Sequence, residues 1–108
     1  MSNTFNTSET YNLKDSVEYA SGSIVSKIVS KNDSGNLTLF AFDKAQSLSK
    51  HTAPFNAFIH ILDGKATILI DDKPYILIQG EAIIMPANIP HAVEATEKFK
   101  MLLVMVKG

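Results

Sequence analysis

The 108-residue chain predicts an all-β domain, either a sandwich or a barrel of short strands. Short apolar, β-branched runs alternate with turns rich in Asp, Asn, Gly and Pro, at intervals of roughly eight to twelve residues. After residue 22 no segment keeps the 3.6-residue period of an amphipathic helix. The expected strands are 24–29, 37–42, 57–62, 65–70, 75–78, 82–85 and 99–106, with turns at 32–36, 63–64 and 71–74.

The first part of the chain is polar and predicts a loose N-terminal arm over residues 1–22, followed by one barrel domain over 23–108. Within the arm, Asn12 is suited to cap a short helical turn that begins at Leu13, with Asp15 at its positive end. Gly22 then ends this turn before the first strand begins.

The composition excludes several classes of protein. The formal net charge is −1 and all ten basic residues are lysines, which argues against a nucleic-acid groove or a polybasic membrane patch. There is no cysteine, so disulfides, cysteine-ligated zinc and thiol nucleophiles are ruled out. No apolar run is long enough to span a bilayer, and the polar N-terminus does not read as a signal peptide. We therefore expect a cytoplasmic protein with no nucleic-acid or membrane partner.

Two of the expected strands, 57–62 and 99–106, are apolar on both of their alternating faces. A small barrel buries only one face of each strand, and each large apolar side chain left in water forgoes roughly 1.5–3 kcal/mol. Something must therefore cover the outer face. The candidates are the N-terminal arm, a second sheet of the same chain, and a second subunit, and we expect a homodimer.

Three histidines are the side chains best suited to chemistry near neutral pH. His51 and His91 stand beside turn residues at expected strand ends, which is where ligands enter a barrel. His60 lies inside an expected strand instead.

Gly80, Pro86 and His91 follow one another at a spacing of Gly-x5-Pro-x4-His. From about residue 40 to residue 106 the sequence resembles the cupins, small double-stranded β-helix (jelly-roll) barrels. Their second motif is Gly-x5-Pro-x-Gly-x2-His-x3-Asn, so here Asn88 stands at its second glycine and Ala95 at its asparagine.

The first cupin motif, Gly-x5-His-x-His-x3,4-Glu-x6-Gly, is less complete. His51 and Gly64 fit it, while Ala45 stands at its first glycine. The resemblance implies a divalent metal held by two histidines and a glutamate of this motif together with the histidine of the second. Ala53 and Ala57 stand at the second histidine and the glutamate. Only His51 and His91 are left as metal ligands, so a Zn, Ni, Fe or Mn ion would be held weakly.

The family pattern also gives a direction to His60. Position 57 faces the barrel interior in cupins, so strand alternation sends 59 and 61 inward and 58, 60 and 62 outward. His60 is then expected to point away from His51 and His91, and only a bulge would make it a third ligand.

Together these observations predict a pocket that holds a small organic molecule, with His51 and His91 at its polar end. Two other functions stay open: a metal-dependent isomerase or oxygenase that uses the two histidines, and a structural or regulatory dimer with a vestigial pocket. The residues expected to line the pocket are Phe40 or Phe42, Ile59, Ile61, Met85, Val93 and Met101.

Overall fold

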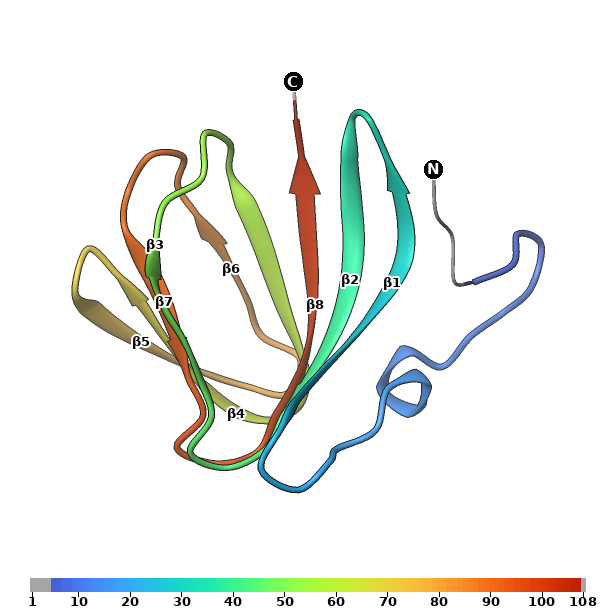
Figure 1. Ribbon diagram of the computed structural model, residues 1–108, viewed down its shortest axis with the longest axis horizontal. Coiled ribbons are helices and arrows are strands. Elements are labelled where there is room, and N and C mark those ends of the chain that lie inside the picture. Colours follow the sequence, from blue (N-terminus) through green and yellow to red (C-terminus); the bar gives the residue numbers. More distant parts are fainter. Residues whose placement is uncertain (1–4, 108) are drawn as a thin grey trace.

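The computed structural model describes residues 5–107 and shows one strongly curled sheet whose two halves face each other (Figure 1). This confirms the predicted all-β barrel. A single 3-10 helix, η1 (Leu13–Ser16), precedes the strands β1 (Ile24–Asn32), β2 (Gly35–Phe42), β3 (Ser47–His51), β4 (Ala57–Ile70), β5 (Lys73–Ile78), β6 (Ala82–Met85), β7 (His91–Glu94) and β8 (Phe99–Val106).

The two walls of the barrel share β4. Its first half pairs with β6 on one side and β8 on the other, and the wall continues through β2 to β1. Its second half pairs with β5 and β7, and β7 pairs with β3. All of these pairings are antiparallel, and the first wall lies opposite the second in Figure 1.

The turn expected at 63–64 is wrong: the chain runs through it as one long strand, β4. An Asp-Gly pair usually marks a hairpin, but here it follows an irregularity between Ile61 and Asp63, where the strand bends from one wall into the other. Gly64 has φ +76, and a Cβ on it would meet the backbone carbonyl of Lys98. Glycine is therefore required at this position, where β4 lies against the start of β8.

Two short strands, β3 and β7, were not predicted from the sequence. They are five and four residues long, respectively, and pair with each other. In β3 only Leu48 is partly buried and the other residues are exposed, so this mainly polar stretch carries no apolar alternation. These two strands place the expected site histidines opposite each other.

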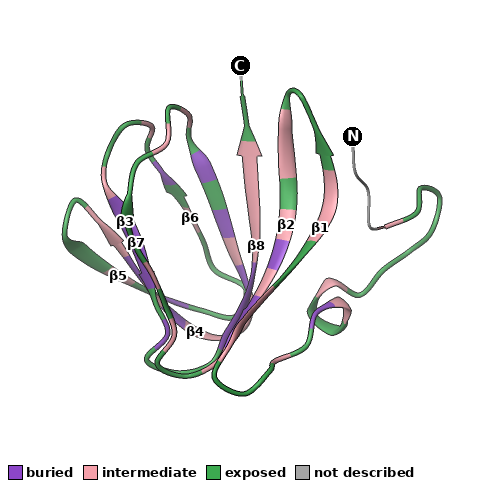
Figure 2. Ribbon diagram, in the orientation of Figure 1, coloured by how far each residue is buried: buried purple, intermediate pink, exposed green. Residues whose placement is uncertain are grey.

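The buried residues of the facing strands, purple in Figure 2, form one apolar cluster between the walls. Strand alternation in β4 is as expected: Ile59 and Ile61 are fully buried, whereas Phe58 is exposed. At the end of the barrel away from the loops 52–56 and 86–90, Phe42 and Phe99 stack with ring centroids 4.6 Å apart. They close that end of the interior.

The N-terminal arm packs on the outer face of the barrel; residues 1–4 of the predicted arm lie outside the described part. As expected, the Asn12 side chain caps η1 by accepting from the backbone N–H of Asp15, although the helix is a single 3-10 turn. Val17 is buried against Leu39 and Ala41 on the outer face of β2. Within residues 5–107 no helix has the length and apolarity needed to cross a bilayer.

Two polar contacts fix the arm to the barrel. The Tyr19 hydroxyl donates to Asp63 at 2.7 Å, and burial followed by this bond raises the pKa of Tyr19 well above its usual range. The Lys100 ammonium, which is largely buried, donates to the Lys14 carbonyl at 2.7 Å and lies over the Tyr19 ring. The arm therefore accounts for part of the apolar outer face.

Residues 5–107 leave another part of the outer face uncovered. Phe58 of β4 and Ile84 of β6 are direct cross-strand neighbours and both are exposed. Leu37 and Val106 extend the same patch across β2 and β8. We call these four side chains the outer patch.

Candidate functional site

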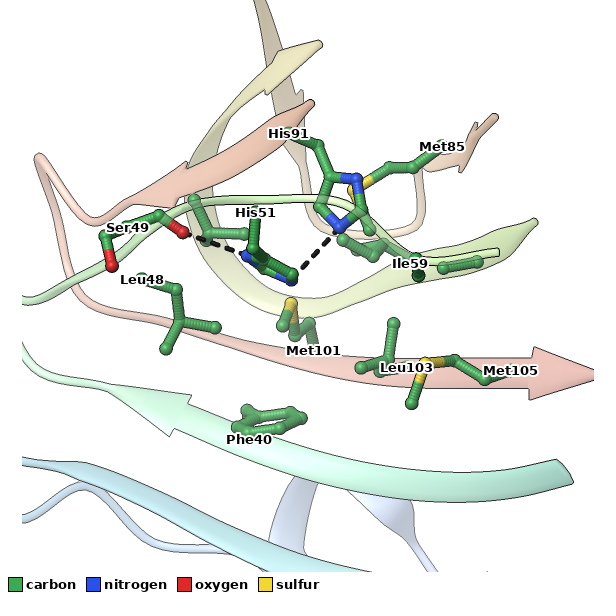
Figure 3. A pocket seen from close by; sticks show the side chains of 13 residues that line it. Phe40, Leu48, Ser49, His51, Ile59, Met85, His91, Met101, Leu103 and Met105 are labelled. Atoms are coloured by element: carbon green, nitrogen blue, oxygen red, sulfur yellow. Dashed lines mark hydrogen bonds between the residues drawn. The ribbon is translucent and has the colours of Figure 1, made fainter. Parts of the chain in front are cut away.

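A cavity of about 530 Å³ lies between the two walls (Figure 3). Its volume is within the range of small-molecule sites. Its lining is almost wholly apolar, apart from the two histidines and one serine. The lining residues are Phe40, Leu48, Ser49, His51, Ala53, Ala57, Ile59, Met85, His91, Val93, Met101, Leu103 and Met105.

His51 and His91 are brought together by the pairing of β3 with β7, in which they are opposite residues. Their Nε2 atoms lie 3.1 Å apart, and the rings meet edge to face with centroids 4.3 Å apart. His91 is buried, whereas His51 is exposed. The pair therefore forms a polar point on an otherwise apolar wall.

The backbone determines the tautomer of both rings. The Nδ1 atom of His51 lies 2.9 Å from the Ser49 carbonyl, and that of His91 lies 3.2 Å from the Ile89 carbonyl. A carbonyl oxygen only accepts, so each Nδ1 carries the proton when its ring is neutral. Both Nε2 atoms then carry a free lone pair and lie 3.1 Å apart, an arrangement that favours a ligand's hydrogen-bond donor or a cation between them.

The pKa of His91 is lowered, first by burial and then by its neighbour His51, while the Ile89 carbonyl acts in the opposite direction. The charged form of His91 is therefore disfavoured. A neutral pair has two acceptors and no proton between them, which makes a donor from a ligand more valuable at this point.

Two loops hold the histidines in place. The Asn88 N–H donates to the Ala53 carbonyl at 2.7 Å, and the Asn56 side chain accepts from the Ala87 N–H at 2.8 Å. These bonds tie the loop after β3 to the loop before β7. The Asn56 contact was not foreseen, because it links residues far apart in the chain.

The cavity includes most of the side chains expected in the pocket, namely Phe40, Ile59, Met85, Val93 and Met101 together with His51 and His91. Phe42 and Ile61 face the interior but belong to the packed core and do not line the cavity. The expected lining did not include Leu48, Ser49, Leu103 and Met105. Alternation along β8 pointed to Leu103 and Met105, since they lie on the same face as Met101.

His60 lies on the outer face, as expected. It is opposite Leu102 and Ala82 in the sheet, near the Phe58 ring, and it borders a shallow surface hollow beside η1. It is not part of the cavity that contains His51 and His91.

The four-ligand metal centre of the family does not fit these residues. Ala53 and Ala57, at the positions of the second histidine and the glutamate, do line the cavity beside the histidine pair. Their methyl groups offer no donor atom. Among the residues that the structure describes, no three His, Cys, Asp or Glu side chains gather closely enough to hold a metal ion.

Comparison with solved structures shows the same fold. A conserved protein of unknown function from Streptococcus pyogenes is 36% identical, with a TM-score of 0.93 over 100% of this chain and 96% of that one. A cupin 2 conserved barrel domain protein from Leptotrichia buccalis is 47% identical, with a TM-score of 0.87 over 90% of this chain. The match spans only 47% of that protein, so this chain corresponds to about half its length.

A more distant structure, a cupin superfamily protein from Desulfitobacterium hafniense, is 24% identical with a TM-score of 0.88 over 95% of this chain and 94% of that one, and supports the fold alone. No curated protein sequence matches the chain. The family model for the cupin domain matches residues 38–107. With the motif spacing, the barrel and this match in agreement, the chain belongs to the cupin family.

Proposed function

We propose that this cupin binds a small organic molecule in the barrel, with the apolar body of the ligand between the walls and a hydroxyl or acid group at the histidine pair. The observation that carries the proposal is an apolar cavity in which the Nε2 atoms of His51 and His91 face each other at 3.1 Å without a protein donor between them. A ligand O–H or N–H supplies the missing donor.

The cavity favours such a ligand for two reasons. Its walls are apolar, so transfer of an apolar body from water contributes about 25 cal/mol for each Å² that is buried. Its single polar point leaves little choice of orientation, because a polar group placed anywhere else would lose its hydrogen bonds to water. The bound molecule is therefore expected to be mostly apolar with its polar group at one end.

A metal-dependent isomerase or oxygenase is the second candidate. The observation in its favour is that nitrogen atoms 3.1 Å apart can both ligate one ion. Against it stands the loss of two ligands at Ala53 and Ala57, since stable zinc sites take three or four protein ligands. A vestigial pocket in a structural or regulatory dimer is the third candidate.

Methionine methyl groups make a direct test, because Met85, Met101 and Met105 all line the cavity. The protein would be labelled at the methionine methyl carbons and screened by NMR against small aromatic and aliphatic alcohols, phenols and carboxylic acids. Each hit would be compared with its methyl ether or ester, which lacks the donor hydrogen. Hits that shift these methyl signals and weaken on methylation are expected.

Variants complete the test. His91→Ala is expected to remove the preference for the free alcohol or acid over its methylated form, whereas His60→Ala is a matched control on the outer face. Stoichiometric Zn, Ni, Fe or Mn in protein purified without a histidine tag, lost in His51→Ala, would favour the enzyme. A complete lack of hits in the metal-free protein would leave the vestigial pocket as the best account.

A further inference from the structure

The methionines of the cavity are arranged around the place where the family's carboxylate ligand is missing. In the sheet, Ala57 is opposite Met85 of β6 on one side and Met105 of β8 on the other. Directly opposite residues of antiparallel strands point to the same face, with Cβ atoms roughly 4.5–5.5 Å apart. Two thioether side chains therefore flank the position that lost its oxygen donor.

A third thioether faces the histidines. Met101 lines the cavity from β8, and in Figure 3 its sulfur atom is drawn next to the His51 ring and that of Met85 next to the His91 ring. The cavity thus combines two imidazoles with three thioethers. No carboxylate is among the residues that line it.

This set of donors is neutral and soft. Thioethers favour soft ions such as monovalent copper, and imidazole suits copper as well as Zn, Fe and Ni, whereas Mg, Ca and Mn favour carboxylate and carbonyl oxygens. The absence of carboxylates from the lining adds to this preference, since a divalent ion in an apolar cavity carries more uncompensated charge than a monovalent one. Position 57 carries alanine where the family has glutamate, and this difference changes the kind of metal that the cavity is suited to bind.

The geometry of the pair points the same way. With nitrogen–metal distances of about 2.0–2.1 Å, Nε2 atoms 3.1 Å apart subtend an angle of about 100° at the metal. Such an angle suits a three- or four-coordinate ion, so at least one further donor is needed. The bonds from Nδ1 to the Ser49 and Ile89 carbonyls hold the Nε2 lone pairs in place, as second-shell partners of metal-binding histidines do.

We propose that His51, His91 and the cavity methionines form a soft-metal site that binds one monovalent copper ion. The site goes beyond the proposed function, because it needs no organic ligand. It also differs from the family's metal centre in donor atoms and in charge. No oxidation or reduction is part of the proposal.

The test is a titration of the full chain with Cu(I) under anaerobic conditions, in competition with a chromogenic Cu(I) chelator. The wild-type protein is expected to retain one ion per chain. Met85→Leu and Met101→Leu keep the side-chain volume and remove the sulfur, and each is expected to weaken Cu(I) binding roughly tenfold or more. His51→Ala is expected to abolish it, and His60→Ala to leave it unchanged.

X-ray absorption of the copper-loaded protein gives an independent readout, in which both nitrogen and sulfur neighbours are expected. Nitrogen neighbours alone, or leucine variants that bind as tightly as the wild type, would overturn the role of the methionines. Failure to compete with the chelator, or equal retention of Mn(II), would overturn the site. These results would leave the proposed binding of an organic molecule unaffected, because the NMR screen that tests it is done without metal.

Discussion

Ala57 and His91 lie on opposite walls of one cavity, and the first of them stands where the family carries a metal-binding glutamate. The second retains the family's histidine. The barrel has thus kept the scaffold of a metal centre while losing half of its donor atoms, and this relationship leads directly to the first prediction.

Replacement of Ala53 by His together with Ala57 by Glu is expected to create a tight site for Mn, Fe, Ni or Zn. Both positions line the cavity beside His51 and His91, so the two new side chains complete a set of four ligands. Isothermal titration with Mn(II) and Zn(II) measures the gain. The same double substitution in a His91→Ala background is the control. No gain in the double variant would mean that the motif register assigned to residues 45–64 is wrong.

Ala45 holds the left-handed backbone conformation, φ +73, at a position where the family motif has glycine. The left-handed region costs an alanine roughly 1–2 kcal/mol, and part of this is offset by the greater freedom of glycine in the unfolded chain. Ala45→Gly is therefore expected to stabilise the fold by about 0.5–1 kcal/mol in urea denaturation.

Asn88 is the matched control, because it stands at a glycine position of the second family motif with φ +64. Asparagine tolerates this conformation far better than alanine, so Asn88→Gly is expected to change the free energy of unfolding by much less. Equal gains in the two variants would contradict the explanation by backbone strain.

The carboxylate of Asp43 joins the arm to the start of the barrel. The backbone N–H groups of Gly22 and Lys44 hold the pKa of Asp43 below its usual range. A lowered folded-state pKa stabilises the fold above the unfolded-state value of about 3.9, and this contribution is lost as the pH falls through the folded-state pKa. Asp43→Ala is expected to lower stability at pH 7, and its difference from the wild type is expected to shrink as the pH falls below the unfolded-state value toward the folded-state pKa.

Urea denaturation from pH 3 to pH 7 measures this difference. Asp33→Ala, in the exposed turn between β1 and β2, is the control for the loss of one negative charge. A difference between Asp43→Ala and the wild type that stays constant across this range would show that the carboxylate charge is not the cause.

The outer patch predicts self-association, because the described part of the arm leaves its four apolar side chains uncovered. Ile84→Lys is expected to shift light scattering at low micromolar concentration from dimer to monomer. Ile76→Lys is the matched control, since Ile76 on β5 is 62% exposed and Ile84 is 58% exposed. Dissociation by Ile76→Lys alone would place the interface on the other wall, and a monomeric wild type would contradict the homodimer.

Much of the barrel was predictable because its strands obey strand alternation. Strand alternation assigns the buried and exposed faces of residues 57–62 once the cupin resemblance places position 57 in the interior, and it correctly directs His60 outward. The 63–64 turn was predicted wrongly because the local preference of Asp63-Gly64 for a turn is overridden by pairing on both sides of β4. Local propensity carries no information about such long-range pairing.

For the site, motif spacing and strand alternation predict only which residues face the interior. They select Met101 and Ile59 as interior residues, but they do not say which interior residues pack and which line a cavity. Phe40 and Phe42 share one face of β2, yet Phe42 is stacked on Phe99 and only Phe40 reaches the open space. Whether an inward-facing side chain packs or borders the cavity depends on how the two walls meet, and the sequence of one strand does not contain this information.

The bend in β4 also has a consequence for how the protein comes apart. One continuous strand, β4, supplies hydrogen bonds to both walls. Unfolding of one wall therefore disrupts the strand on which the other wall is built. Gly64 at the crossing and the ladders on either side of it are thus shared by the whole molecule. We expect unfolding to be a single cooperative transition, in which the cavity disappears together with the last of the sheet.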